Sequence, residues 1–118
     1  MAGLKIDRSI RLAMLLKEEI AGIISREMKD PGLKMVTVTH VKLTKDLRDA
    51  EIFYSVLGNE EDVGKTERIL DRASGFIRGE LGRTLRIKRI PHLSFKYDDS
   101  FEKGMKIEKL MREITGDE

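Results

Sequence analysis

Apolar positions recur at helical spacing in the first quarter of the chain. The segment from residue 7 to residue 29 places its apolar residues at intervals of three and four, so they share one side of a helix. The residues on that side are Ile10, Ala13, Leu16, Ile20 and Ile24. Charged side chains occupy the opposite side. The pattern predicts one long amphipathic helix with a buried face.

Two segments after this helix are typical of β-strands. Residues 35–44 are rich in β-branched side chains. In residues 49–58 an apolar series, Ala50, Ile52, Tyr54 and Val56, alternates with a series that also includes Phe53 and Leu57, so both faces of this strand are expected to be partly buried. The connecting segment, Lys-Asp-Leu-Arg-Asp, has the length of a hairpin loop. We therefore expect an antiparallel pair.

Three further elements are expected in the second half of the chain. A helical segment follows the acidic turn Gly-Asn-Glu-Glu-Asp-Val-Gly-Lys at 58–65, and residues 89–97 supply a short strand with Leu93, Phe95 and Tyr97 on one face. A closing helix carries Ile107, Leu110, Met111 and Ile114 on one stripe. Asp99 and Glu102 have the spacing of a capping box at its start.

These elements follow the order helix, strand, strand, helix, broken helix, strand, helix. Helices around a small mixed sheet make an α+β fold of one layer on another. The chain has 118 residues and contains no repeat, low-complexity tract or linker, so residues 1–118 are expected to form a single domain.

Glycines predict a break in the second helical segment. Gly75, Gly79 and Gly82 fall within eight residues, and each costs about 1 kcal/mol in a helix interior relative to alanine. We expect Gly82 to end the helix in a left-handed cap. Gly79 and Gly82 also have the GxxG spacing of a KH domain, in which the backbone approaches four nucleotides, but a lone GxxG is weak evidence.

The distribution of charge along the chain says more about a binding partner than the overall composition does. The chain has 23 basic and 21 acidic residues, a net charge of +2, yet residues 72–96 hold seven Lys/Arg and a single acid, Glu80. A segregated positive surface on a nearly neutral protein indicates a polyanionic partner such as nucleic acid. The alternative is a solvated face whose charges are balanced by neighbours in the fold.

Catalytic and metal chemistry have little support. The chain has no cysteine, its two histidines, His40 and His92, are far apart, and no phosphate-binding or dinucleotide fingerprint is present. Acidic pairs are expected to be solvated faces or caps, so we expect no enzyme, metal or cofactor. The first apolar stretch is too short and too interrupted by charge for a signal peptide or a membrane span, and we expect a cytoplasmic protein with no membrane partner.

Several segments together resemble the ribosome-binding factor A family. They are Lys-Asp-Pro-Gly-Leu at 29–33, Asp-Arg-Ala-Ser-Gly-Phe-Ile-Arg at 71–78, Arg-Ile-Pro-His-Leu-Ser-Phe-Lys-Tyr-Asp-Asp-Ser at 89–100 and Ile-Glu-Lys-Leu-Met at 107–111, in order over about residues 4–115. The resemblance implies a type II KH-like fold with a three-stranded sheet. It also implies an Ala-x-Gly kink between two helices, which here corresponds to Ala73-Ser74-Gly75.

The resemblance further implies an assembly factor that binds the free 30S small ribosomal subunit and 16S rRNA during late maturation. It implies assistance to processing of the 16S rRNA 5′ end, especially in the cold, without nuclease activity, and we expect a monomer. Aromatic residues are scarce and mostly at core-facing positions, so we expect recognition of RNA backbone and shape. Our candidate RNA contacts are Arg8, Arg11, Arg72, Ser74, Gly75, Arg78, Arg83, Arg86, Lys88 and Arg89.

Three alternatives stay open. A generic KH-type binder of single-stranded RNA would share the basic surface but accept many RNAs. A protein-interaction module would use the hydrophobic hairpin edge and keep its partner without the arginines. A hydrolase would need a site that the sequence does not display.

Overall fold

A computed structural model gives the structure of the chain and describes residues 8–28 and 35–116. The described elements are α1 (Arg8–Glu27), β1 (Met35–Leu43), β2 (Asp49–Leu57), α2 (Glu60–Thr84), β3 (His92–Tyr97) and α3 (Ser100–Thr115). Their order confirms the predicted α+β class with a three-stranded sheet. The Lys-Asp-Pro-Gly-Leu segment expected to follow the first helix lies outside the described residues.

The sheet has the order β1-β2-β3. β1 and β2 are antiparallel, as the hairpin prediction required, and β3 runs parallel to β2. The register of the antiparallel pair shifts between Val38 and His40, so one extra residue, Thr39, bulges opposite Phe53. The hydroxyl of Thr39 donates to Asp98 Oδ2 at 2.6 Å, which ties the bulge to the residue just after β3.

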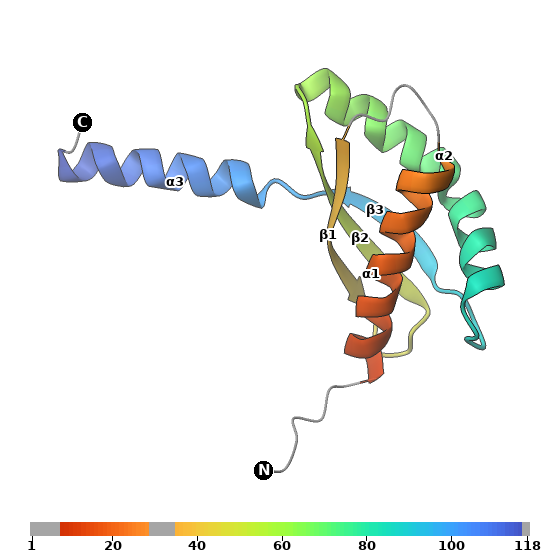
Figure 1. Cartoon of the computed structure of the whole chain (residues 1–118). Helices are drawn as coiled ribbons and strands as arrows, with labels where there is room; N and C mark the ends of the chain where they lie inside the picture. The colour runs from red at the N-terminus through yellow and green to blue at the C-terminus, as the bar shows by residue number, and fades with distance from the viewer. Residues whose placement is uncertain (1–7, 29–34, 117–118) are drawn as a thin grey trace, which may run out of the picture.

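The hydrophobic core lies between one face of the sheet and two helices. α1 packs on β1, α2 packs on β3, and the two helices contact each other (Figure 1). Alternation along β2 explains which face is covered, since Ala50, Ile52 and Tyr54 are buried while Glu51, Phe53 and Ser55 are half-buried. In the described part of the chain no helix covers the second face. The core residues are Leu16, Ile20, Ile23, Ile24, Val38, Val41, Ala50, Ile52, Tyr54, Leu70, Ile77, Leu81, Leu93 and Phe95.

The two expected helices of the middle segment form the single helix α2, which runs through Ala73, Ser74 and Gly75 without interruption. Figure 1 shows α2 changing direction along its length. Kinks occur at Gly/Ser pairs, and the Ser74 hydroxyl donates to the Asp71 carbonyl at 3.0 Å, a type of bond that bends helices. The assignment of this bend to Ala73-Ser74-Gly75 stays a prediction.

Both ends of α2 differ from the sequence-based expectation. The helix begins at Glu60, inside the segment 58–65 that was expected to be a turn. Its start has a capping box, in which Asn59 accepts a bond from the Asp62 N–H and the Asp62 side chain accepts one from the Asn59 N–H. The predicted left-handed cap at Gly82 is wrong. The helix continues to Thr84, and its C-cap is Leu85 in extended conformation.

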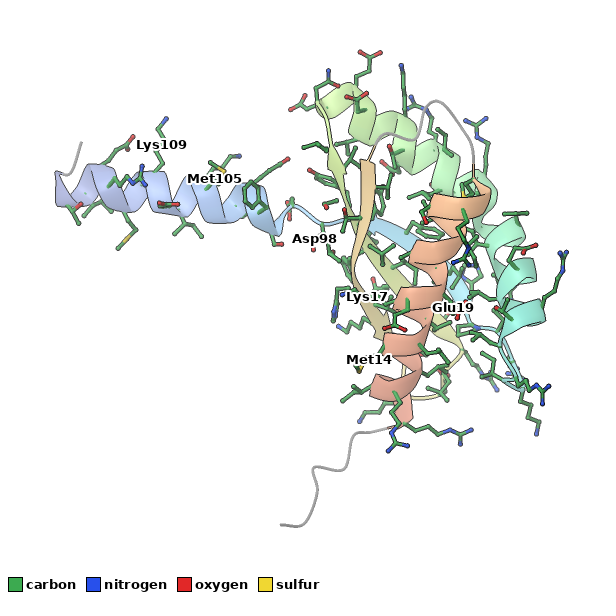
Figure 2. The ribbon with its side chains drawn as sticks, viewed as in Figure 1. Met14, Lys17, Glu19, Asp98, Met105 and Lys109 are labelled. Carbon is green, nitrogen blue, oxygen red and sulfur yellow. The ribbon has the colours of Figure 1, made fainter. Side chains whose placement is uncertain are left out.

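α3 stands away from the rest of the molecule (Figure 1). None of its residues is buried, and its apolar stripe, which the sequence placed among helices around the sheet, is exposed to solvent. Figure 2 shows Met105 and Lys109 on this projecting helix and Asp98 at its base. The predicted capping box is also wrong, because Asp99 makes no side-chain cap bond and the Glu102 carboxylate accepts a bond from the Tyr97 hydroxyl at 2.7 Å instead.

Candidate nucleic-acid interface

A hollow of ≈ 670 Å³ lies where three separate segments meet at one end of the molecule. The segments are the start of α1, the turn between β1 and β2, and the loop between α2 and β3, which Figure 1 shows together at the end nearer the N-terminus. Its lining combines five basic side chains, four aliphatic ones and one acid. The lining residues are Arg8, Arg11, Leu12, Leu15, Asp46, Leu47, Arg86, Ile87, Lys88 and Arg89, and we call this site the basic hollow.

The first turn of α1 strengthens the positive potential of the basic hollow. A helix N-terminus carries about half a positive charge, which favours bound anions. The first turn of α1 contains no acidic residue but does contain Arg8 and Arg11, both exposed. Cations at this end destabilise the helix, so their placement favours an external anion over the stability of α1.

The single carboxylate of the basic hollow is held by its own turn. Asp46 Oδ1 accepts bonds from the Thr44 hydroxyl at 2.7 Å and from the Arg48 backbone N–H at 3.1 Å. The bond from Thr44 is the main cause that lowers the pKa of Asp46 below its usual value. The carboxylate therefore stays ionised and stabilises the turn, and the basic side chains around it keep a net positive charge.

Leu47, in the same turn, has an unusual backbone conformation. Its φ is 61°, the left-handed region, which costs a non-glycine residue about 1–2 kcal/mol. Its N–H donates to the Thr44 carbonyl at 2.9 Å, and its half-buried side chain lines the basic hollow. Leu47 is not among the site residues predicted from the sequence. The available signal was a tight turn, Lys-Asp-Leu-Arg-Asp, that contains neither glycine nor asparagine.

Arg78 supports the basic hollow from outside its lining. Its Nε donates to the Pro91 carbonyl at 3.0 Å and its Nη2 donates to the Ile90 carbonyl at 3.1 Å. These bonds fix the end of the loop that carries Arg86, Lys88 and Arg89. The sequence predicted Arg78 as an RNA contact, and the structure adds a positioning role.

The remaining predicted contacts lie along α2 and not in the basic hollow. Arg72 Nε donates to the Arg68 carbonyl at 3.3 Å, and Arg83 pairs with Glu80 at 2.9 Å. Ser74 is half-buried, and Gly75 is exposed. The ten predicted contacts therefore divide into five residues in the basic hollow, the supporting residue Arg78, and four residues on α2.

The outward side of α2 also carries an exposed aromatic ring. Phe76 is 47% exposed, and helical spacing puts it on the same side as Arg72 and Arg83. A Cβ added to Gly75 or to Gly79 would meet no atom within 4 Å. The expectation that aromatic residues face the core is thus wrong for Phe76, and also for Phe101, which is 77% exposed.

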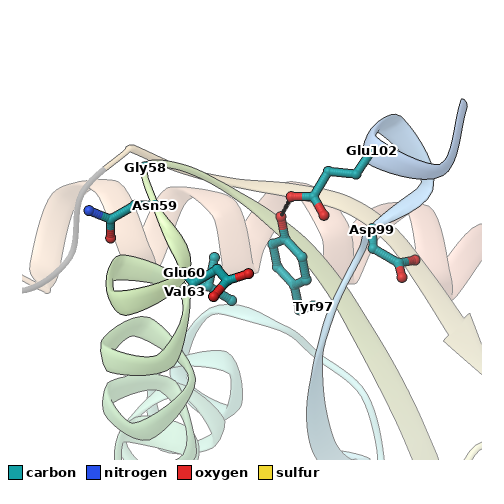
Figure 3. Close-up of a pocket in the computed structure, with 7 residues that line it drawn as sticks. All are labelled: Gly58, Asn59, Glu60, Val63, Tyr97, Asp99 and Glu102. Atoms are coloured by element: carbon teal, nitrogen blue, oxygen red, sulfur yellow. Dashed lines mark hydrogen bonds between the residues drawn. The ribbon is translucent and has the colours of Figure 1, made fainter. Parts of the chain in front are cut away.

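A second hollow, of ≈ 510 Å³, has the opposite character. It lies between the start of α2 and the base of α3, and its lining includes Glu60, Asp99 and Glu102 (Figure 3). The hydrogen bond from Tyr97 to Glu102 is the main cause that raises the pKa of Tyr97 to about 12. Acidic walls repel phosphate, so this hollow does not extend the candidate interface.

The described residues contain no cluster of side chains suited to binding a metal ion. Residues 8–28 and 35–116 hold no group of three or more His, Asp or Glu side chains that could bind a metal ion. The His40 ring lies beside the Phe53 ring on the open face of the sheet. His92 lies opposite Asp49, the first residue of β2, in the register of β2 and β3. Within the same residues, no helix is both long and apolar enough to cross a membrane.

Comparison with known proteins places this arrangement in a family. The family model described as "Ribosome-binding factor A" matches residues 8–111. A protein of that name from Staphylococcus epidermidis is 42% identical over 107 residues, which cover 91% of this chain and 92% of the relative. These matches confirm the resemblance on which the sequence-based assignment rested.

Structures of this family also align with the chain. The crystal structure of ribosome-binding factor A from Thermus thermophilus aligns with a TM-score of 0.68 and 31% identity, over 77% of this chain and 97% of that one. A homology model of the Thermus thermophilus factor, fitted into a cryo-EM map of its 30S complex, aligns with a TM-score of 0.63 and 30% identity, over 74% of this chain and 91% of that one. The chain belongs to the ribosome-binding factor A family.

Proposed function

We propose that this protein binds the 30S small ribosomal subunit through 16S rRNA during late maturation and assists processing of the rRNA 5′ end, especially in the cold. The observation that carries the proposal is the basic hollow, in which three separate segments present five cations around one carboxylate. A fitted Thermus thermophilus relative in a 30S complex supports the choice of partner.

The mechanism we propose is binding without bond cleavage. A protein shifts a conformational equilibrium only as far as its affinities for the two conformations differ. A monomer whose cations hold one rRNA conformation would keep that conformation populated until the subunit matures. Misfolded RNA helices escape more slowly at low temperature, so the effect should matter most in the cold.

The proposed RNA contacts form two groups. Arg8, Arg11, Arg86, Lys88 and Arg89 would hold phosphates at the basic hollow. Arg72, Ser74, Gly75 and Arg83, with Phe76 beside them, would meet RNA along α2, where bare glycines permit close approach of a backbone. Arginine suits both groups, because its guanidinium grips phosphate in two bonds and stacks on unpaired bases.

Co-sedimentation with purified small subunits and with joined ribosomes tests this proposal. We expect binding to the free subunit and dissociation from the joined ribosome. The triple variant Arg8→Ala, Arg11→Ala, Arg86→Ala should weaken binding and flatten the log–log salt dependence by about two units, at about 0.7 per phosphate. The matched control Lys103→Ala, Lys106→Ala, Lys109→Ala removes the same charge from α3 and should bind like the parent.

Two results would contradict the proposal. Equal losses in both triple variants would mean that net charge alone governs binding. Displacement from the subunit by equal amounts of unrelated single-stranded RNA would favour a generic RNA binder. In the same preparations, a precursor of 16S rRNA incubated with magnesium should stay uncut, and cleavage that survives repurification would indicate a nuclease.

A further inference from the structure

The basic hollow contains more than phosphate recognition requires. Cations on an open, polar surface suffice to hold a phosphate backbone. Here the cations share the lining with four aliphatic side chains, Leu12, Leu15, Leu47 and Ile87. Leu12, Leu47 and Ile87 are half-buried, while Leu15 is 39% exposed. All five basic side chains of the lining are exposed, so we call the aliphatic residues the floor and the basic residues the rim.

The conformation of Leu47 indicates that this floor is not incidental. Glycine or asparagine would satisfy a left-handed position in a tight turn without strain. Leucine at φ 61° adds strain and directs an aliphatic side chain into the basic hollow. Strained backbone persists where the surrounding structure holds it, and it is concentrated at ligand sites.

Resting on the proposed function, we propose that the basic hollow takes one unpaired nucleotide of the bound RNA, with its base on the aliphatic floor and its flanking phosphates on the arginines. The hollow, at ≈ 670 Å³, lies within the range of about 300–1,000 Å³ typical of small-ligand pockets. Unstacked bases of single-stranded RNA are held by apolar contacts and by the planes of arginine guanidinium groups. Charge complementarity selects the occupant, since an uncharged apolar ligand would leave the rim unused.

The test compares RNA that has bases with RNA that lacks them. Short single-stranded oligonucleotides are matched in length and phosphate number, and one set carries abasic residues. We expect the wild-type protein to bind the base-containing set at least about fivefold more tightly. In parallel, the methyl resonances of Leu12, Leu15, Leu47 and Ile87 should shift on binding only the base-containing RNA. Equal affinity for both sets would overturn the proposal.

Variants separate the floor from the rim. Leu47→Asn suits the left-handed turn but removes aliphatic surface, so it should abolish the preference for bases and leave the salt dependence unchanged. Its matched control is Leu57→Asn, at the exposed end of β2, which should keep the preference. Arg86→Ala should do the reverse of Leu47→Asn, with a salt dependence flatter by about 0.7 units and the preference retained. A preference unchanged in Leu47→Asn would overturn the proposal.

Free nucleoside monophosphates distinguish RNA from a metabolite. A single nucleotide lacks the flanking phosphates, so it should compete only at concentrations far above those of the oligonucleotide. Competition at equal concentrations would assign the site to a free nucleotide and overturn the RNA assignment. Salt-dependent subunit binding without any base preference would overturn only this inference, whereas loss of subunit binding in the wild-type protein would overturn the proposed function itself.

Discussion

Arg78 donates to two carbonyl oxygens at the end of the loop before β3, while Arg86 and Arg89 in that loop line the basic hollow. At the residue scale the sequence shows which residues are basic but not whether each one contacts RNA or positions the loop. All three arginines sit in the same basic stretch, and nothing in their spacing separates a positioning residue from a rim residue. Their separation depends on how the loop folds back on α2, which is a tertiary contact.

Leu47 provides a stability test at this scale. Its positive φ excludes β-branched residues, so Leu47→Val should lower the free energy of unfolding by about 1–3 kcal/mol. Leu47→Gly removes the strain but also the half-buried side chain, so its stability should stay close to that of the wild type. Urea unfolding measures both. Leu57→Val, at an exposed strand end, is the control, and a Leu47→Val protein as stable as that control would contradict the assigned conformation.

Asp98 predicts a dependence of stability on pH. Hydrogen bonds from Ser100 and from Thr39 lower its pKa from 3.8 to about 2. Because the folded pKa lies below the unfolded value, this contribution is present above about pH 4 and is lost as the pH falls towards 2. Urea unfolding should show Asp98→Asn less stable than the wild type at pH 6, with the difference shrinking by pH 2.

At the element scale, periodicity and turn chemistry place most of the fold. The apolar spacing of α1, the alternation in β2 and the hairpin between β1 and β2 are all visible in the sequence, because each depends on neighbours a few residues away. The exceptions are the helix ends. At the start of α3 the expected capping box of Asp99 and Glu102 does not form, because the Glu102 carboxylate accepts a hydrogen bond from Tyr97. At the start of α2, Asn59 and Asp62 form a capping box that the sequence did not predict.

The glycines of α2 predict a trade between stability and binding. Neither Gly75 nor Gly79 has a positive φ, and neither has an atom within 4 Å of an added Cβ. Gly75→Ala and Gly79→Ala should therefore each stabilise the protein, by up to about 1 kcal/mol, because alanine favours helix. If RNA approaches the helix there, both should also weaken subunit binding.

Thermal melting and co-sedimentation measure the two effects. Gly104→Ala on α3, where an added Cβ also meets nothing, is the matched control and should leave subunit binding unchanged. A destabilised Gly75→Ala protein would instead show that the bend of α2 needs glycine at that position. Stabilisation without any loss of binding would remove α2 from the interface.

At the scale of the whole molecule, the family segments identify the family, which periodicity alone does not. The α+β class and the three-stranded sheet follow from the order of elements. The basic hollow does not, because residues near positions 10, 47 and 88 come together only when both helices pack on the same face of the sheet. The exposed position of α3 was equally hidden, since an apolar stripe predicts a buried face whether or not a partner surface lies within reach.

The isolation of α3 has a consequence for amide hydrogen exchange. Isolated helices of about 12–15 residues are marginal in water, and α3 has only 16. Its support in the described structure is surface ion pairs, the hydrogen bond from Tyr97 to Glu102 near its start and a left-handed cap at Gly116. Its opening should therefore need far less free energy than global unfolding, whereas amides of β2 should exchange only when the whole body unfolds. Mass spectrometry of deuterated protein should find α3 exchanged within seconds while β2 stays protected. Equal protection would mean that α3 folds as one cooperative unit with the sheet.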